Sequence, residues 1–379
     1  MQNKQNYYLR LSVKNLETFM DCYNLAPLAQ KPLTCPFLLF FQANYVPMEF
    51  KKNPDNFFVE EVMAPQMRGG KYFYYILEKK GIDSPHAIAI VEEKNHARIF
   101  SSGLKDSDAH TMQWICSEKE LVSPKDDRIW LAFKGKSGQK IFVGMHSANR
   151  FRVTLRSLSL IEKKILSSDL RKTAFPNYFD EQRFNEKTVS AGTELLRENW
   201  EDAVKAVLTE RLGFESEKSV EIKNLVAHNW GEWKMLAESA AMPDSKKPIF
   251  RHLEGGGSFK DAIRLLDSKS ISIACRAAQS LQFNKLLAAE ILKQNAANQK
   301  FIRVGEQELP VRFSFKGIKR EMVVPPVFPK KTILKRKTFF HADKARALLD
   351  GKNCILEFDL RKSCYATILI KCLQAMGGE

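Results

Sequence analysis

Long apolar runs are missing from this sequence of 379 residues. Its longest, such as "FLLFF" at 37–41, are far below the roughly 20 residues that a membrane-spanning helix needs. The first residues, "MQNKQNYYLRLSVKNL", have no apolar core of the kind that a signal peptide carries. We therefore expect a soluble, cytoplasmic protein that does not insert into membranes.

The sequence also lacks pairs of cysteines or histidines at the short spacings that are typical of metal sites. The seven cysteines are scattered without CxxC spacing, and the seven histidines form no HxH or HExxH pair. An odd number of cysteines in a large chain favours buried thiols in a reducing compartment over a disulfide framework or a zinc site. Internal repeats and low-complexity tracts are not evident either.

Acidic residues are in deficit. The chain has 60 Lys and Arg against 44 Asp and Glu, which gives a formal net charge of +16. A fixed positive potential of this size attracts phosphate and releases condensed counterions, so a nucleic acid is the partner that the charge favours. A basic protein with no such partner remains the simpler alternative.

The length and texture of the chain predict more than one domain. A chain of 379 residues with 44% apolar content exceeds one ordinary core and is not of the disordered class. Strand patterns near both ends flank helical patterns from about 190 to 320, which suggests an inserted domain. We expect the following segments: an extension of unknown role at 1–45, a first catalytic part at 46–175, an insertion at 176–322, and a linker with a return to the first domain at 323–379.

Local patterns predict the elements around one polar stretch, "SSGLKDSDAH" at 101–110. Strands are expected over 57–62 and within 70–81. A helix should follow, with Ser84 as its N-cap and Pro85 at its first position. The short strand "ARIF" then leads to Gly103, which we expect to be a turn. The glycine-rich "EGGGS" at 254–258 lacks the features of a phosphate loop and is expected to be a plain turn.

After Asn149 the residues alternate cleanly, as in a strand with two different faces. One face should be apolar and begin with Phe151, while the other should carry Arg150, Arg152 and Arg156. A solvated sheet face would explain this row of arginines, and so would contact with phosphates.

The stretch at 101–110 allows three chemistries. Asp106, Asp108 and His110 would share one face of a strand and suit a hard or borderline cation, although no further ligand with recognisable spacing appears. Alternatively Asp106 is a single catalytic carboxylate whose charged form is favoured by Lys105 beside it. The third possibility is a basic groove with aromatic platforms that binds RNA without chemistry.

Six stretches, taken in order, resemble the TruD family of tRNA pseudouridine synthases. They are "KKNPDNFFVEEV", "GLKDSDAHTMQ", "ANRFRVTLR", "PNYFDEQRF", "QSLQFNKLLAAEIL" and "LRKSCYATILIKCL". The resemblance runs from about residue 48 to the end. It implies an α+β fold, in which a catalytic domain with a mixed, mainly antiparallel sheet is interrupted by a family-specific α/β insertion.

The resemblance also implies a reaction, the isomerisation of uridine to pseudouridine in RNA without cofactor or metal. By position, Asp106 matches the family's catalytic aspartate, which attacks ribose C1′ or removes the C2′ proton. The uracil then turns and rejoins through C5. Family members commonly modify a uridine in the D-arm region of tRNA, of the position 13 type. A catalytically inactive tRNA-binding protein or RNA chaperone is the alternative, and we expect a monomer.

Further site residues are carried over from the matching motifs. Phe151 matches the aromatic residue that stacks on the uracil, although a plain core role would suit it too. Lys51 matches a basic residue near the aspartate, or is a surface lysine. The remaining substrate-binding candidates are Phe57, Glu61, Lys105, Asn149, Arg150 and Arg152. We expect these two arginines and the basic stretch at 330–337 to contact phosphates, which position RNA without specifying its sequence.

Several residues depart from the family pattern. Ala148, Asp180 and Asn185 stand where the family has glycine, so backbone freedom at turns would be lost there. Asn56 replaces an aspartate, and Asp108 adds an acid near the expected RNA path. None of these changes removes Asp106, so they bear on RNA specificity more than on chemistry.

Overall fold

The chain divides into two units, Met1–Val46 and Pro47–Glu379. The computed structural model describes residues 53–184, 186–210, 216–294, 300–305, 307–311 and 317–377, all within the second unit. The expected extension at 1–45, Lys51 and Asn185 lie outside the described residues.

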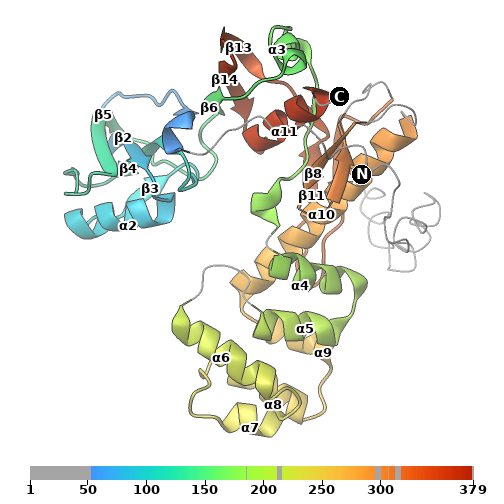
Figure 1. Cartoon of the computed structure of the whole chain (residues 1–379). Helices are drawn as coiled ribbons and strands as arrows, with labels where there is room; N and C mark the ends of the chain where they lie inside the picture. The colour runs from blue at the N-terminus through green and yellow to red at the C-terminus, as the bar shows by residue number, and fades with distance from the viewer. Residues whose placement is uncertain are drawn as a thin grey trace, which may run out of the picture. The chain divides into compact units, whose positions relative to one another are not determined.

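An eight-stranded sheet takes strands from both ends of the described chain (Figure 1). Its strand order is β13-β14-β6-β1-β4-β2-β5, and β3 also pairs with β4. The bounds are β1 Phe57–Val62, β2 Tyr72–Lys80, β3 Ile99–Ser101, β4 His110–Ser117, β5 Ile129–Ser137, β6 Ala148–Leu155, β13 Asp343–Asp350 and β14 Asn353–Arg361. β1 and β4 pair in parallel and the other pairs are antiparallel. The expected mixed, mainly antiparallel sheet is confirmed.

The two faces of this sheet differ in composition. The inner face carries Phe57, Val59, Phe151 and Val153, and the outer face carries Phe58, Glu60, Arg150 and Arg152. The alternation expected after Asn149 is confirmed, because Phe151, Val153 and Leu155 are buried, whereas the arginines at 150, 152 and 156 are exposed. The strand begins at Ala148, one residue before Asn149.

Helices pack on the inner face. They are α2 (Ser84–Asn95), α3 (Leu160–Leu166) and α11 (Ala366–Gly377). Ala87 and Val91 of α2 form a cluster with Tyr75 and Leu77 of β2. The expected cap of α2 is wrong by one residue, because Asp83 accepts the hydrogen bond from His86 N. Ser84 is instead completely buried and bonds to a distant loop.

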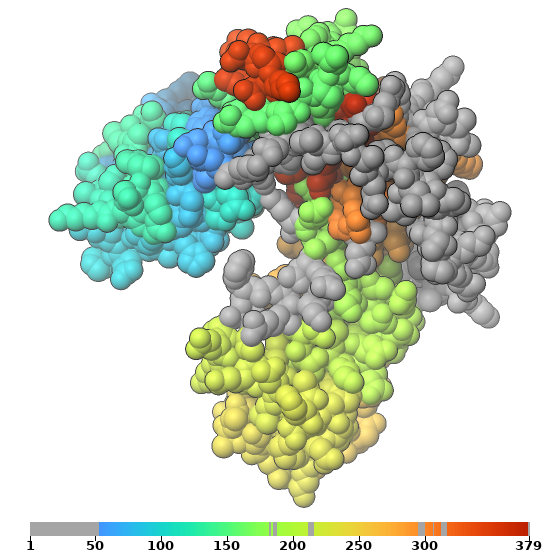
Figure 2. All heavy atoms as spheres, in the orientation of Figure 1, coloured from blue at the N-terminus to red at the C-terminus, as the bar shows by residue number. Residues whose placement is uncertain are grey.

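The middle of the chain is helical. Its helices are α4 Glu186–Arg197, α5 Trp200–Thr209, α6 Glu217–His228, α7 Trp233–Glu238, α8 Lys247–Glu254, α9 Phe259–Ala262 and α10 Ser268–Gln294. Atoms of α4 to α9 gather in one green-to-yellow body in Figure 2. Near the start of this segment Glu198 has a φ of 60° and separates α4 from α5. The expected turn at 254–258 is confirmed, with Gly256 at φ +78°.

Helix α10 connects two apolar cores. Ala274 and Cys275 in its first half pack into the core of the helical segment. Phe283, Leu287 and Ile291 in its second half pack into the core that contains Phe151 and α11. None of the described helices is both long and apolar enough to span a bilayer.

Short elements complete the fold. They are η3 Pro54–Asn56, η4 Leu170–Lys172, η5 Glu181–Arg183, η6 Ile263–Leu265, β7 Phe175–Pro176, β8 Phe301–Val304, β9 Gln307–Pro310, β10 Glu321–Val324, β11 Leu334–Lys337 and β12 Phe339–Phe340. β10 and β11 form an antiparallel pair, so part of the expected basic linker is a strand.

Candidate active site

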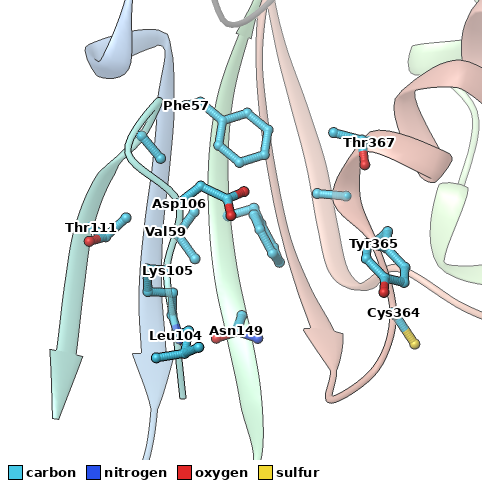
Figure 3. Close-up of a pocket in the computed structure, with 13 residues that line it drawn as sticks. Phe57, Val59, Leu104, Lys105, Asp106, Thr111, Asn149, Cys364, Tyr365 and Thr367 are labelled. Atoms are coloured by element: carbon cyan, nitrogen blue, oxygen red, sulfur yellow. The ribbon is translucent and has the colours of Figure 1, made fainter. Parts of the chain in front are cut away.

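Asp106 lies in the loop between β3 and β4, beside a pocket of about 160 Å³ on the inner face. The side chain is exposed, so a substrate can reach its carboxylate. In Figure 3 this carboxylate faces the space between the strands and the segment that carries Tyr365 and Thr367. The pocket is lined by Phe57, Val59, Leu104, Lys105, Asp106, Ala109, Thr111, Asn149, Phe151, Cys364, Tyr365, Ala366 and Thr367.

Buried polar side chains fix the backbone of this loop. Ser84 Oγ accepts from Lys105 N at 2.8 Å, and Ser84 N donates to Lys105 O at 3.1 Å. Gln113 Nε2 donates to Gly103 O at 3.4 Å. Lys79 Nζ donates to Asp106 O at 2.8 Å and to Ile82 O at 2.6 Å. The loop carries no strand pairing, so these bonds replace a sheet ladder in determining its conformation.

Lys79 was missed by the sequence reasoning. It is 0% exposed, and burial lowers the pKa of its ammonium group from 10.5 to about 8, although the charges of Asp106 and Asp83 oppose that shift. A lysine at an inward-facing strand position, next to apolar Leu77, was the signal in the sequence that could have revealed it.

Lys105 does not fill its expected role as the cation paired with Asp106. Its Nζ donates to Glu61 Oε1 at 2.6 Å, and both side chains are buried. Glu61 also accepts from Trp114 N at 3.0 Å. Glu61 and Lys105, both substrate-binding candidates, therefore form an ion pair with each other below the loop that carries Asp106.

His146 extends this ion pair into a buried polar group. Its Nδ1 lies 3.9 Å from Glu61 Oε1 and 2.6 Å from Ser102 Oγ. Burial lowers the pKa of His146, which Glu61 partly offsets. The lowered pKa favours the neutral form of the His146 imidazole, next to the Glu61 and Lys105 pair.

Gly103 is constrained by crowding and not by the expected turn geometry. A Cβ atom there would lie 3.1 Å from Glu61 Oε1 and 3.3 Å from both His146 Cε1 and Lys105 Nζ. Its φ is not in the left-handed region. The glycine therefore allows the loop to pass directly over the buried ion pair.

Phe151 belongs to the apolar core and also lines the pocket. Its ring is 7% exposed and stacks on Phe358 with centroids 5.2 Å apart. Phe57 meets it edge-on at 5.9 Å. Both Phe57 and Phe151 also line the pocket beside Asp106. The neighbouring rings hold Phe151 in one orientation while leaving part of it at the pocket.

Asn149 reaches the same pocket from β6. Its Oδ1 is buried, and among the described residues no donor bonds to it. Thr111 Oγ1, on β4 at the other side of β1 in the same sheet, is also buried and has no partner among the described residues. Buried polar atoms normally have partners, so these two mark the pocket wall as suited to a polar ligand.

The opposite wall comes from the start of α11 and was not singled out from the sequence. Tyr365 and Thr367 lie there, within a stretch quoted above only for its family resemblance. Burial raises the pKa of the Tyr365 hydroxyl. The Arg336 guanidinium lies 5.7 Å from the Tyr365 ring centroid.

Arg150 and Arg152 lie on the outer face, away from the Asp106 pocket. Arg150 pairs with Asp359 at 3.1 Å and with Glu60 at 3.3 Å. Arg152 lies 3.8 Å from Glu357. These carboxylates neutralise much of the guanidinium row that the sequence pattern predicted.

The three residues of the metal alternative do not converge. His110 lies on the outer face and pairs with Glu78 at 2.6 Å, whereas Asp106 lies at the inner-face pocket. Asp108 is exposed and accepts from Ser107. Within the described part of the chain, no three His, Cys, Asp or Glu side chains could hold a metal ion together.

The departures at Asp180 and Ala148 do not strain the backbone, contrary to expectation. Asp180 has a φ of −95°, which any residue adopts. Its buried carboxylate pairs with Lys371 Nζ at 2.8 Å. Ala148 pairs within β6 without a positive φ. At Asn56, the side-chain oxygen accepts from Arg156 at 3.4 Å.

Residues 38–302 match the family model of tRNA pseudouridine synthase D (TruD). A protein of Methanococcus maripaludis named "Probable tRNA pseudouridine synthase D 1" is 28% identical over 263 residues, which cover 65% of this chain and 67% of that protein. The tRNA pseudouridine synthase D of Aquifex aeolicus is 25% identical, with 86% of this chain and 97% of the relative covered.

A solved TruD structure from Methanosarcina mazei has the same fold. It superposes with a TM-score of 0.56 at 19% identity, and the match covers 89% of this chain and 95% of that one. At this identity the likeness concerns the fold alone.

Proposed function

Because this chain belongs to the tRNA pseudouridine synthase D (TruD) family of isomerases, we propose that it converts a uridine of tRNA to pseudouridine. The observation that carries the proposal is the position of Asp106. Its exposed carboxylate stands at the inner-face pocket, on a loop that buried side chains hold in place.

We propose that Asp106 performs the chemistry at the ribose. Its ionised oxygen attacks C1′ as a nucleophile or removes the proton from C2′, and either step detaches the uracil from C1′. The detached uracil rotates within the pocket and C5 bonds to C1′, which releases the carboxylate from C1′ or, in the second route, is accompanied by return of the proton from Asp106 to C2′. C5 then loses its proton to solvent and N1 takes one up, so the product is an isomer of the substrate. Uridine and pseudouridine are isomers, so no oxidant, reductant or cofactor is consumed.

Two pocket residues are suited to holding the uridine. Phe151 offers a fixed aromatic ring for stacking, and Asn149 lines the pocket with an amide group that can hydrogen-bond to the polar edge of uracil. The base must leave its stack to reach them, which costs a few kcal/mol that stacking and hydrogen bonds in the pocket offset. Lys51, by its motif, would add positive charge near the aspartate.

We propose a uridine in the D-arm region of tRNA, of the position 13 type, as the target. Arg150 and Arg152 remain proposed contacts to phosphates, on the outer face. Mapping pseudouridines in unmodified tRNA before and after incubation with the protein tests the position, and a product outside the D arm would contradict it.

The proposed catalytic domain consists of residues 46–175 and 323–379, interrupted by the insertion at 176–322. The sheet supports this division, because β6, which precedes the insertion in the sequence, pairs with β14, which follows it.

The first test is tritium release from tRNA that is labelled at uridine C5. Wild type should release tritium, and Asp106→Asn should reduce release to background because the amide can neither attack C1′ nor remove a proton. Asp108→Asn is the matched control, since that exposed acid stands two positions away and should be dispensable.

Other outcomes separate the alternatives. A wild-type protein that binds tRNA but releases no tritium from any cellular RNA pool would be an inactive RNA-binding protein or chaperone. Full activity in Asp106→Asn would refute the assignment of the catalytic residue.

A further inference from the structure

Two adjacent lysines of β2 have opposite environments. Lys80 lies on the outer face, where its side chain is 40% exposed and pairs with Asp55 at 2.6 Å. Lys79 lies on the inner face and is 0% exposed. Burying an ammonium group is costly unless it is well bonded, so a fold that retains one at this position requires an explanation.

Backbone carbonyl groups hold the Lys79 ammonium. Its Nζ donates to Ile82 O at 2.6 Å and to Asp106 O at 2.8 Å. The first bond closes the turn between β2 and α2. The second crosses 27 positions of sequence and reaches the peptide group of the very residue that carries the proposed chemistry.

The bond to Asp106 O constrains the direction of the Asp106 side chain. Ser84 and Gln113 hold the peptide groups of Lys105 and Gly103, which precede it. Lys79 holds the carbonyl of Asp106 itself, so rotation of this residue about its backbone would break the bond. A reacting carboxylate displaced by as little as an ångström loses much of its effect.

From these contacts we infer that Lys79 is a positioning residue for Asp106, orienting its backbone and placing a positive charge beneath its carboxylate. This inference rests on the proposed function. Lys79 lies outside the substrate pocket and would not touch the uridine.

The charge of Lys79 depends on its neighbours. Asp106 from the loop and Asp83 before α2 favour the ammonium form, whereas burial and the nearby Lys105 disfavour it, so its pKa falls to about 8. Above that pH the amine is neutral, so the positive charge beneath Asp106 is lost and the bond from Lys79 Nζ to Asp106 O is weaker. The rate at saturating tRNA should therefore decline as pH rises through about 8.

The experiment compares Lys79→Met with the matched control Lys80→Met, using tritium release from saturating labelled tRNA. Lys79→Met should lower kcat by about 30-fold or more while KM changes by less than about threefold, because the loss concerns the reacting group and not RNA binding. Lys80→Met should behave as wild type. Circular dichroism melting of each variant monitors folding.

A role limited to closing the β2–α2 turn predicts a different result. It lowers the melting temperature of Lys79→Met but leaves kcat of the folded protein within about threefold of wild type. That result would overturn the inference while leaving the proposed function intact, provided that wild type is active and Asp106→Asn is not.

The pH profile decides the matter if Lys79→Met does not fold. A wild-type kcat that stays constant between about pH 7 and 9.5 would overturn the inference. A decline near pH 8 that Lys79→Arg shifts upward would support it, because a guanidinium keeps its proton in this range. If wild type releases no tritium from any RNA, both the inference and the proposed function fail.

Discussion

At the scale of single residues, the site depends on how closely the Asp106 loop approaches a buried ion pair. Glu61 and Lys105 are 2.6 Å apart, and Gly103 crosses directly over them. A buried pair of this kind is stable only while both partners and their hydrogen bonds are present. The loop therefore depends on a small residue at Gly103.

Gly103→Ala is expected to destabilise the protein and to slow catalysis. The added methyl group would sit 3.1 Å from Glu61 Oε1, and overpacking of this kind costs about 1–3 kcal/mol. Relief requires the side chains of the ion pair or the loop to shift, and the loop carries Asp106. Urea unfolding and tritium release measure the two effects.

Gly138→Ala provides the control, because a Cβ there meets nothing within 4 Å. It should leave both the free energy of unfolding and kcat nearly unchanged. Equal behaviour of the two alanine variants would show that crowding at Gly103 has no consequence.

At the scale of elements, strand β11 shows how a basic run acquires two different roles. The sequence hypothesis assigned the whole run at 330–337 to phosphate contacts. Arg336 is instead 6% exposed. Its guanidinium donates to Asn177 O and Oδ1, each at 2.8 Å, and lies 3.9 Å from the Phe179 ring centroid. This arginine therefore connects β11 to the 177–179 segment and is not available to RNA.

Arg336→Met should lower the free energy of unfolding by about 2–4 kcal/mol, because several bonds to a charged group are lost and their acceptors stay buried. The salt dependence of tRNA affinity should not change. Lys331→Ala serves as the comparison, since that exposed lysine in the same run can reach a phosphate. A reduced salt slope for Arg336→Met would contradict this assignment.

At the scale of the whole molecule, the formal charge of +16 should dominate binding to tRNA. Each phosphate contact releases counterions, so affinity falls steeply as salt rises. Not all of the excess positive charge is available to tRNA, because carboxylates pair with Arg150, Arg152 and Arg346 on the outer face.

We expect the dissociation constant for tRNA to rise about ten- to a thousandfold between roughly 50 and 200 mM salt. The rate at saturating tRNA should change little, because the proposed chemistry occurs inside the pocket. Filter binding across a salt series measures the slope. An affinity that is independent of salt would show that the net charge does not drive recognition.

The sequence by itself determined what depends on neighbours along the chain. Alternation indicated the two faces of β6, helical patterns indicated the helical middle of the chain, and the resemblance to the TruD motifs pointed to Asp106. These features are local, since side-chain direction repeats every two residues in a strand and every 3.6 in a helix.

Only the tertiary structure decided which side chains meet. Lys105 pairs with Glu61 because β1 lies beside β4 in parallel, a contact between segments 44 positions apart. Lys79 reaches Asp106, and Tyr365 closes the pocket, for the same reason: strand order brings distant segments together. No local pattern specifies that order, so the sequence identified the proposed catalytic carboxylate but not the residues that hold it in place.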